Sequence, residues 1–386
     1  MLFLIIGVAL LVYCFVVFLT PDSGWTFIEA NRTENDSNEL VFQYNLGVNG
    51  KSSADENRAL TAIYNTASEK IFRLFHDKKG FDNLINIYEI NRRPNEELEI
   101  DEALYNALSI FKKYDSRYLY LAPVYSRYDD LFYCLDDSQI VDFDPLTSDD
   151  VKKEYAITAS YANNPEAIDI ELLGDNKIKL FVSEEYLRFA QEEAITDFIG
   201  LSWLKNAFVV DYLADVFISE GYTSGSISSY DGFIRNLDGS GLEYSFNIFD
   251  KMEGNVYHAA VMQYNNAMSI VYLRNYTLNS LDDNHYYRLN NGEVRTPYLD
   301  VKDGIPKSSL NNLVSYSESK GCAEILMEMI PVYISEMFNE QTIGELSESS
   351  IYSVYCKDST IRYNDKDLVL SALYDRNGIK YNAEIF

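Results

Sequence analysis

The sequence predicts an α+β fold, in which mixed sheets are flanked by helices and preceded by one membrane-spanning helix. Three observations predict it. The N-terminus is an unbroken apolar run. Amphipathic patterns of helical period occupy residues 55–75 and 321–338, and another begins at Asp101 with Leu104, Leu108 and Phe111 on its apolar face. Short strand-like runs follow one another from residue 226 to residue 275. A chain of 386 residues is long enough for one large domain with insertions.

The apolar run, residues 2–19 (LFLIIGVALLVYCFVVFL), carries no charge and is long enough to span a bilayer. A cleaved signal peptide is the alternative, but no basic residue precedes the run and no small-x-small cleavage site lies before Pro21. Acidic residues outnumber Arg32 after the run, so the positive-inside rule does not hold that side in the cytoplasm. We expect residues 1–20 to be a single-pass anchor in the cell membrane, with an extracytoplasmic body.

The rest of the chain divides by composition. We predict a linker at 21–39, an α+β domain at 40–345, and C-terminal strands at 346–386 that pack on the same domain. Within the domain, residues 134–177 are rich in aspartate but lack the ligand spacing and the glycine of an EF-hand loop, so we predict a solvated acidic insertion. The stretch NLDGSG, residues 236–241, predicts a hairpin loop.

Charge and cysteine content exclude several classes of function. The formal net charge of -28 repels nucleic acid and anionic membrane surfaces, so neither is an expected partner. The four cysteines, which show no C-x-x-C spacing, indicate neither a zinc site nor a disulfide framework; they are Cys14, Cys134, Cys322 and Cys356.

Three carboxylates are candidate ligands for a hard cation. Glu324 and Glu328 stand four residues apart near the start of the helix predicted at 321–338, which places them on one helix face. Asp300, in the turn LDVKDGIP, could add a third oxygen of the kind that Mg²⁺ accepts. We therefore expect the three to converge on one pocket wall. The alternative is a solvated acidic helix face beside an ordinary turn, which so acidic a composition favours.

A second candidate site begins at TDFIGLSWLKNAF, before a helix that ends near Gly221. A glycine before a helix lets backbone amides approach a phosphate, and a lysine on the first turns adds a positive charge. Gly200 and Lys205 are in these positions. The alternative for Lys205 is an ordinary solvated lysine.

The segment from Gly292 to Glu328 resembles the FAD:protein FMN transferase family (ApbE-like). The family writes Gly, then His-x-x-Asp-Pro-x-Thr-Gly-x-Pro, a strand, and a helix with Ala-Asp-x-Leu-x-Thr. The residues in register with this pattern are Gly292, Asp300, Lys302, Gly304, Pro306, Ala323, Glu324, Leu326 and Glu328. The chain departs from it at the family His, Pro and Thr of the turn, where it has Pro297, Val301 and Asp303. It also departs at the metal-binding Asp and Thr of the helix, where it has Glu324 and Glu328.

Two further stretches are similar to the family. Asp197, Gly200 and Lys205 correspond to its Asp-Leu-Gly-Gly-Ile-Ala-Lys motif, although Leu201, Ser202 and Trp203 fill the glycine region. Its Ile-x-x-Ile-Asn run is matched by Ile87, Ile90 and Asn91, and residues 114–118 replace the start of its flavin-contacting loop. A strand ending at Tyr230 leads to the place where the family has Gly-Gly-Asn.

The resemblance implies an ApbE-like fold and a Mg²⁺-dependent transfer of FMN from FAD to a Ser or Thr of a partner, here a flavin-accepting membrane protein. It implies Glu324 and Glu328 as metal ligands, Lys205, Gly200 and Tyr230 as cofactor-binding residues, and Asp300 as the catalytic residue that orients or deprotonates the hydroxyl. The alternative, favoured by Pro297 and the lost glycines, is a catalytically degenerate binding or assembly module. A third reading is that the chain itself accepts a flavin at residues 223–226.

Overall fold

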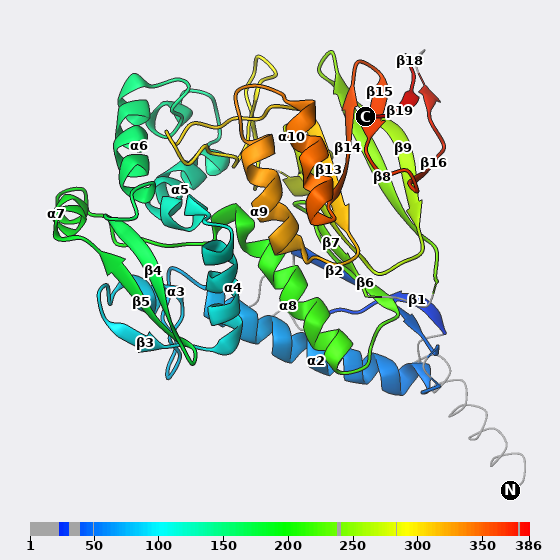
Figure 1. Ribbon diagram of the computed structural model, residues 1–386, viewed down its shortest axis with the longest axis horizontal. Helices are drawn as coiled ribbons and strands as arrows, with labels where there is room; N and C mark the ends of the chain where they lie inside the picture. The colour runs from blue at the N-terminus through cyan, green and yellow to red at the C-terminus, as the bar shows by residue number, and fades with distance from the viewer. Residues whose placement is uncertain (1–22, 31–38, 49, 238–240, 283, 377–378) are drawn as a thin grey trace, which may run out of the picture.

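A nine-stranded mixed sheet forms the centre of the structure, a computed structural model that describes residues 23–30, 39–48, 50–237, 241–282, 284–376 and 379–386 (Figure 1). Its strands lie in the order β1-β2-β6-β7-β10-β13-β14-β15-β19. In that order their bounds are Gly24–Phe27, Leu40–Leu46, Gly225–Ser229, Phe233–Asn236, Met268–Arg274, Asn312–Ser317, Tyr352–Lys357, Thr360–Tyr363 and Asn382–Ile385. Neighbours run antiparallel, except for β15 and β19, which are parallel.

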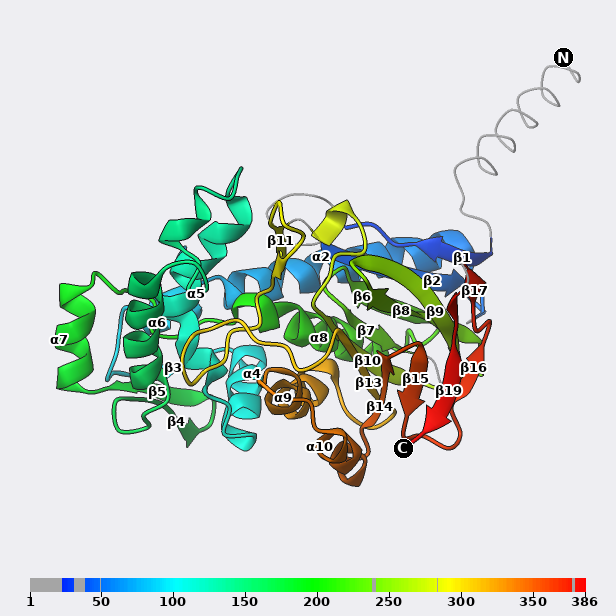
Figure 2. The same cartoon turned by 90° about the horizontal axis from the view of Figure 1, so that it is seen from above.

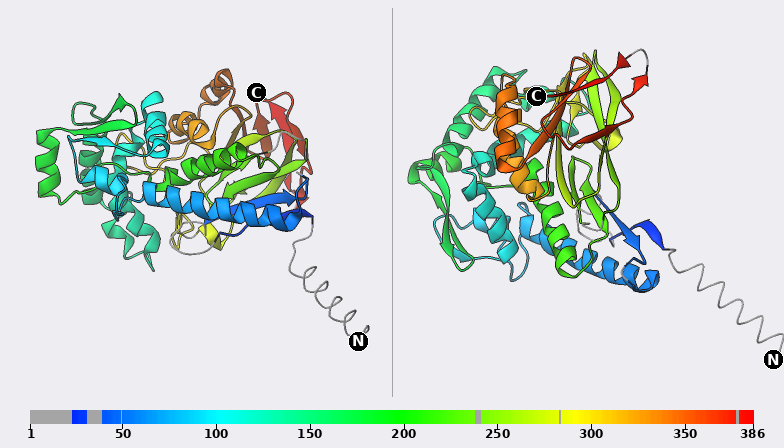
Figure 3. Two further views of the ribbon diagram at one scale, coloured as in Figure 1. Left: turned by 90° about the horizontal axis from the view of Figure 1, so that it is seen from below. Right: turned by 45° about the vertical axis from the view of Figure 1, so that its right-hand side comes forward.

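Three helices cover one face of this sheet: α2 (Ser53–Phe75), α8 (Lys205–Ser219) and α9 (Cys322–Tyr333) (Figure 3). The helix predicted at 55–75 is confirmed as α2. It begins where the side chain of Ser52 accepts a hydrogen bond from the backbone N–H of Asp55, which caps one of the unpaired amides at the helix start. Its apolar positions recur at helical spacing and are buried against α8 and the sheet.

The central sheet has a hydrophobic core on each face. Successive side chains of a strand point to opposite faces, and apolar side chains occupy both faces. In β10, Val271 and Leu273 join the core under the helices, while Ile270 and Tyr272 join a second core on the opposite face. The second core is closed by a three-stranded sheet of β16 (Val369–Ser371), β9 (Asn255–Tyr264) and β8 (Tyr244–Met252).

The hairpin predicted at residues 236–241 is wrong. Strand β7, which precedes it, pairs with β6 and β10, whereas β8, which follows, pairs with β9 in the other sheet. The chain crosses between two sheets there, and residues 238–240 lie outside the described residues. The tight hairpin lies instead between β8 and β9, where Glu253 and Gly254 both have positive φ, as a two-residue turn of this kind requires.

A lobe built around a smaller sheet, β3-β5-β4, occupies the end of the molecule away from β8 and β9 (Figure 2). The strands are Glu97–Glu99, Lys177–Val182 and Ile168–Gly174. The surrounding helices are α3 (Ile87–Asn91), α4 (Glu102–Lys113), α5 (Ala122–Tyr128), α6 (Asp149–Ala162) and α7 (Glu184–Glu192). The carboxylate of Asp101 caps α4 by accepting from the backbone N–H of Ala103.

Much of the predicted solvated insertion, residues 134–177, is a folded part of this lobe, which corrects that prediction. Helix α6 buries Val151, Tyr155 and Ala159 against the core. These apolar positions follow one another at intervals of four among charged residues, so the acidic composition concealed an ordinary amphipathic helix.

The C-terminal residues complete both large sheets. Residues 346–386 contribute β14, β15 and β19 to the central sheet and β16 to the second. Helix α10 (Glu340–Glu345) precedes them. Two short ladders complete the described elements: β11 (Tyr287–Arg288) with β12 (Val294–Arg295), and β17 (Asp375–Arg376) with β18 (Ile379–Lys380).

Helix α9 ends earlier than predicted. We expected its apolar stripe to continue through Met337 and Phe338, but the helix ends at Tyr333 and Met337 is 80% exposed. Pro331 has no N–H for the helix ladder, and its ring crowds the preceding turn, so the helix stops two residues later.

Within the described ranges, no helix has both the length and the apolar composition needed to cross a bilayer. The predicted anchor at residues 1–20 lies outside those ranges.

Candidate functional site

A cavity of about 320 Å³ lies at the start of α8, against the end of α2 and the segment that leads to Pro297. Two kinds of side chain dominate its lining. One is aromatic: Phe72, Phe75, Phe132, Tyr133 and Trp203. The other is acidic: Glu39, Asp77, Asp129 and Asp231. The basic side chains on its lining are Lys205, His76 and His285. We call this the α8 cavity.

Asn91 fixes the segment that forms one wall of the α8 cavity. Its carboxamide donates to the backbone oxygen of Ile199 at 2.8 Å and accepts from the backbone N–H of Ile199 at 2.9 Å. Next to it, the N–H of Gly200 donates to the backbone oxygen of Leu119. The two stretches that matched the family motifs, Ile87–Asn91 and Asp197–Lys205, are therefore in direct contact.

Gly200 is needed for packing. A Cβ on this residue would come within 3.1 Å of the side chain of Ala122, so the glycine admits a neighbouring helix. It is buried, and it is not part of the lining of the α8 cavity. The prediction that Gly200 binds a cofactor gains no support from this position, whereas Lys205 does line the cavity.

Ser202 takes a glycine-like backbone conformation. Its φ is +44°, in the left-handed region that a residue with a side chain adopts at a cost of about 1–2 kcal/mol. Beside it, the indole N–H of Trp203 donates to the hydroxyl of Tyr125 at 2.8 Å, and that hydroxyl donates to the backbone oxygen of Pro297 at 3.0 Å. The Trp203 side chain thus joins the start of α8 to the segment that carries Pro297.

Asn206 holds two carboxylates together at the acidic end of the cavity. Its amide nitrogen donates to Glu39 at 3.0 Å and to Asp231 at 2.9 Å. Burial raises the pKa of Asp231, against the opposing effects of the His285 charge and the hydrogen bond from Asn206. The carboxylates lie near the α8 N-terminus, where the helix dipole favours negative charge.

A second carboxyl with a perturbed pKa lies across the cavity. Burial, reinforced by the neighbouring charge of Asp77, raises the pKa of Asp129 to about 7, although Lys78 opposes the shift. A carboxyl that titrates near neutral pH can accept or donate a proton at a bound ligand. Sequence inspection missed Asp129 because its cavity neighbours come from α2, α8 and the β6–β7 turn.

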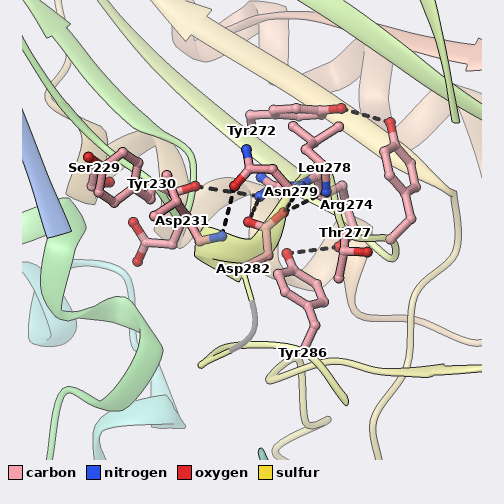
Figure 4. A network of polar contacts seen from close by, with 12 residues as sticks. Ser229, Tyr230, Asp231, Tyr272, Arg274, Thr277, Leu278, Asn279, Asp282 and Tyr286 are labelled. Atoms are coloured by element: carbon pink, nitrogen blue, oxygen red, sulfur yellow. Dashed lines mark hydrogen bonds and ion pairs between the residues drawn. The ribbon is translucent and has the colours of Figure 1, made fainter. Parts of the chain in front are cut away.

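A buried polar network supports the turn between β6 and β7, which carries Tyr230 and Asp231 (Figure 4). Arg274 and Asp282 form a buried ion pair, and the guanidinium also donates to the backbone oxygen of Tyr230 at 3.5 Å. The hydroxyl of Tyr286 donates to the backbone oxygen of Arg274 at 3.2 Å. The network thereby connects the β6–β7 turn to the chain on both sides of Asp282.

Tyr230 contributes through its backbone. Its N–H donates to the backbone oxygen of Glu39 at 3.1 Å, and its ring is 36% exposed and outside the cavity lining. The predicted cofactor role of its side chain is therefore unsupported, and the adjacent Asp231 is the residue that lines the cavity.

A separate groove of about 710 Å³ runs along α9 on the other side of the segment 297–307. Its walls are residues 114–118, the turn at Asp300, and the α9 face that carries Met327 and Pro331. The Asp300 carboxylate accepts from the backbone N–H of Lys302 at 3.0 Å and from the ammonium of Lys307 at 2.9 Å. Lys205 and Asp300, both predicted from the family resemblance, thus line two different cavities.

The two glutamates of α9 are both engaged by lysines. Glu324 pairs with Lys113 and accepts from the hydroxyl of Tyr114, and Glu328 pairs with Lys320 at 2.6 Å. Partial burial alone would raise the pKa of Glu324, but the hydrogen bond and charge of Lys113 outweigh it and the pKa is lowered. Neither glutamate lines the groove in which Asp300 lies.

The expected convergence of Asp300, Glu324 and Glu328 is therefore wrong. Within the described part of the chain, no three His, Cys, Asp or Glu side chains are close enough to hold a metal ion. The physical reason is that Lys113 and Lys320 neutralise the glutamates that a cation was expected to bridge. Lys113 lies 211 residues from Glu324, so no local pattern indicates that pairing.

The segment 223–226 is also unsuited to accept a flavin. Ser224 is buried, and its backbone oxygen accepts from the N–H of Asn45 at 2.8 Å. Gly225 starts β6 and pairs with Tyr44 of β2. An acceptor hydroxyl must be accessible to the donor, which the burial of Ser224 prevents, whereas Thr223 and Ser226 are half-buried.

Comparison with known proteins bears on the fold. No protein-family model matches the sequence, and no curated protein is significantly similar to it. Solved structures do match. The flavin transferase ApbE from Vibrio cholerae superposes with a TM-score of 0.57 at 12% identity, over 91% of this chain and 97% of that one. The ApbE protein from Thermotoga maritima gives 0.56 at 11% identity, over 86% and 94%.

This chain has the ApbE fold. The Pseudomonas stutzeri flavinyl transferase ApbE, in its apo form, adds a third match, with a TM-score of 0.52 at 9% identity over 91% of this chain and 94% of that one. The ApbE-like fold that the motifs implied is thus confirmed. At these identities the likeness concerns the fold alone, so the function of this ApbE-fold chain has to be argued from its own residues.

Proposed function

We propose that this ApbE-fold chain is a flavin-binding module that holds the ring system and sugar-alcohol chain of a flavin in the α8 cavity and does not transfer FMN. The observation that carries the proposal is the lining of that cavity, which combines aromatic side chains with hydrogen-bond acceptors. The flavin itself is suggested by the structural neighbours, which are described as flavin transferases.

The lining suits a flavin ring in two ways. Aromatic side chains such as Trp203 and Phe75 offer faces and edges against which a flat heteroaromatic ring can pack. The carboxylates of Glu39 and Asp231 accept hydrogen bonds, and a flavin offers a ring N–H and the hydroxyls of its ribityl chain as donors. A volume of about 320 Å³ is near the lower end of the roughly 300–1,000 Å³ of small-molecule sites, which favours part of FAD over the whole dinucleotide.

The same lining disfavours a diphosphate. Four carboxyl groups face the cavity, and like charges in a partly desolvated site repel strongly. Lys205, His76 and His285 offset part of this charge. We therefore expect affinity to fall in the order riboflavin, FMN, FAD.

Magnesium does not fit the residues that the family resemblance assigned to it. Glu324 and Glu328 are paired with lysines, and the described residues supply no third ligand at either one. Transfer that depends on a bound metal to neutralise FAD phosphates is therefore no part of the proposal. Membrane anchoring, an extracytoplasmic body and a flavin-accepting membrane partner are further proposals, which rest on the sequence of residues 1–39 and on the family resemblance.

The test uses the two tryptophans of the chain. In a Trp25→Phe variant, Trp203 is the only indole fluorophore, and it lines the cavity, whereas Trp25 lies on the edge strand β1 and is 49% exposed. We expect riboflavin to quench the fluorescence of Trp25→Phe in a saturable manner, and to leave the remaining emission of the matched Trp203→Phe variant largely unchanged. No saturable quenching by any of the three flavins would refute the proposal.

The transferase alternative is supported by the fold and has its own assay. The full chain is mixed with FAD, Mg²⁺ and a peptide that contains an acceptor threonine, and the peptide mass is measured. We expect no added FMN, with or without Glu324→Ala, and no change of the thermal midpoint on addition of Mg²⁺ alone. FMN on the peptide that disappears in Glu324→Ala would establish the transferase and overturn the binding-module proposal.

A further inference from the structure

The chain between α5 and α6 projects from the body of the molecule (Figure 2). We call residues 129–150 the acidic arm, because they contain eight aspartates and no lysine or arginine. Three residues of the arm, Asp129, Phe132 and Tyr133, also belong to the cavity lining. The arm is therefore part of the cavity mouth as well as a projection from it.

The acidic arm is anchored at several points. At its base, Asp144 is fully buried and pairs with the buried Arg295 at 2.8 Å. Further out, Asp137 accepts from the hydroxyl of Tyr287 at 3.1 Å and from the backbone N–H of Asn290 at 3.0 Å. A flexible acidic loop would need none of these contacts. The arm instead holds its surface in one arrangement.

That surface is apolar as well as acidic. Leu135 is 90% exposed, Tyr133 69%, Leu146 52% and Val141 47%. Single exposed apolar residues are common, but four within fourteen consecutive residues of an anchored segment indicate a surface that another molecule covers. The apolar core of an interface surrounded by charge is the usual composition of a protein docking site.

Charge complementarity decides what kind of molecule that is. Among the aspartates of the arm, Asp130, Asp136 and Asp142 are exposed, and the arm has no cation of its own to neutralise them. A nucleic acid, an anionic bilayer or a second copy of this acidic chain would be repelled. A segment with lysine or arginine beside apolar side chains satisfies both features of the arm.

We propose that the acidic arm is the docking surface for a partner protein that presents a segment of alternating basic and apolar residues. The partner segment places its apolar side chains over Leu135 and Val141 and its cations against the neighbouring aspartates. Since Tyr133 belongs to both surfaces, a docked partner lies at the mouth of the α8 cavity. The proposal goes beyond flavin binding and does not depend on it.

The first experiment measures binding of a defined probe to the full chain. The probe is a fluorescein-labelled peptide in which lysine alternates with leucine. Its binding is measured by fluorescence anisotropy at physiological salt. Two comparison peptides replace leucine by serine or lysine by glutamate. We expect the lysine–leucine peptide to bind at least tenfold more tightly than either comparison peptide, and its affinity to fall as salt is raised.

Variants place the binding on the arm. The pair Leu135→Ser and Val141→Ser should weaken binding of the lysine–leucine peptide at least fivefold. The matched control pair Leu173→Ser and Ile218→Ser changes two exposed apolar residues on β4 and α8, which are 44% and 41% exposed, and should leave binding unchanged. Equal binding by both pairs, or equal binding of the lysine–serine peptide, would overturn the proposal, because general attraction to an acidic protein would then explain it.

Two more readings complete the test. Vesicles of neutral phosphatidylcholine that bind wild type and not the arm variants would assign the arm to a lipid surface and would contradict a protein partner. Riboflavin quenching of Trp203 is measured on the same variants and should be unchanged. Loss of peptide binding with unchanged quenching would therefore support the docking surface. Absence of quenching in all the proteins would contradict the flavin proposal and leave the docking proposal standing.

Discussion

Replacing Asp129 by asparagine should change how the stability of this protein depends on pH. Burial and the neighbouring Asp77 raise the pKa of the Asp129 carboxyl from the usual 3.8 to about 7. Between these two values the folded protein keeps a proton that the unfolded chain has released. The free energy of unfolding therefore falls as pH rises from about 4 to about 7, and the full loss is reached above the folded pKa.

The size of the effect follows from the two pKa values. Their difference is about three pH units, and each unit corresponds to about 1.36 kcal/mol, which gives about 4 kcal/mol for a fully shielded group. Asp129 is half-buried, so solvent reduces this to roughly 2–4 kcal/mol. Asp129→Asn removes the titrating group. Its stability relative to wild type should rise by that amount between pH 4 and pH 8.

Urea unfolding at a series of pH values from 4 to 8 measures the difference in free energy of unfolding between Asp129→Asn and wild type. The asparagine also changes stability by an amount that is the same at every pH. The test is therefore the slope of the difference with pH. Asp82→Asn, at an exposed carboxylate, is the matched control and should give a flat difference. Asp77→Asn removes the neighbouring charge and should move the transition of Asp129 to lower pH. A flat difference for Asp129→Asn would refute the reasoning.

Three further substitutions test how the walls of the α8 cavity are built. Ser202→Gly should raise the free energy of unfolding by about 1 kcal/mol in urea, because glycine adopts the positive φ of this position without strain. Asn91→Ala should lower it by about 2–3 kcal/mol, because both polar backbone groups of Ile199 lose their buried partner; hydrogen exchange of the Ile199 amide should speed up with it. Arg274→Met should lower it by about 3–5 kcal/mol by leaving Asp282 buried without its cation, and Asp282→Asn added to it should recover part of the loss. Unfolding free energies that do not move in these directions would contradict the corresponding contact.

The parts of the fold that the sequence predicted are those with local signals. The start of α2 is set by the side chain of Ser52 and the start of α4 by that of Asp101, and both caps act within three residues of themselves. Apolar spacing then predicts which faces of these helices are buried. The end of α9 was predicted wrongly although a local signal was present. Pro331 indicates an end to the helix, but the apolar stripe beyond it was given more weight.

The parts that could not be predicted depend on pairs far apart in the chain. Asp144 was assigned to a solvated insertion, but its partner Arg295 follows 151 residues later and buries it. In the same way, Lys113 removes Glu324 from a metal site that helix spacing alone suggested. A carboxylate beside an unknown neighbour can be a ligand, a cap or half of an ion pair, and only the tertiary structure distinguishes them.

The family motifs predicted which segments of the chain are in contact, but not which residues share a ligand site. Asn91 and Gly200 were matched to two separate motifs, and Asn91 forms hydrogen bonds to the backbone of Ile199, the residue before Gly200. The residues expected to act on substrate do not meet: Lys205 lines the α8 cavity, whereas Asp300 lies in the groove along α9. The matched positions therefore indicated a backbone contact of this chain, and they did not indicate a single ligand site.

The strand order of the central sheet also determines where the domain can grow. Its first described strand, β1, and its last, β19, occupy the two outer edges, so every strand between them already has neighbours on both sides. An added strand, whether a fused peptide or an extension of either terminus, can join the hydrogen-bond ladder at those margins without opening the interior. Loss of β1 or β19 likewise removes an outer strand and leaves the ladder from β2 to β15 continuous.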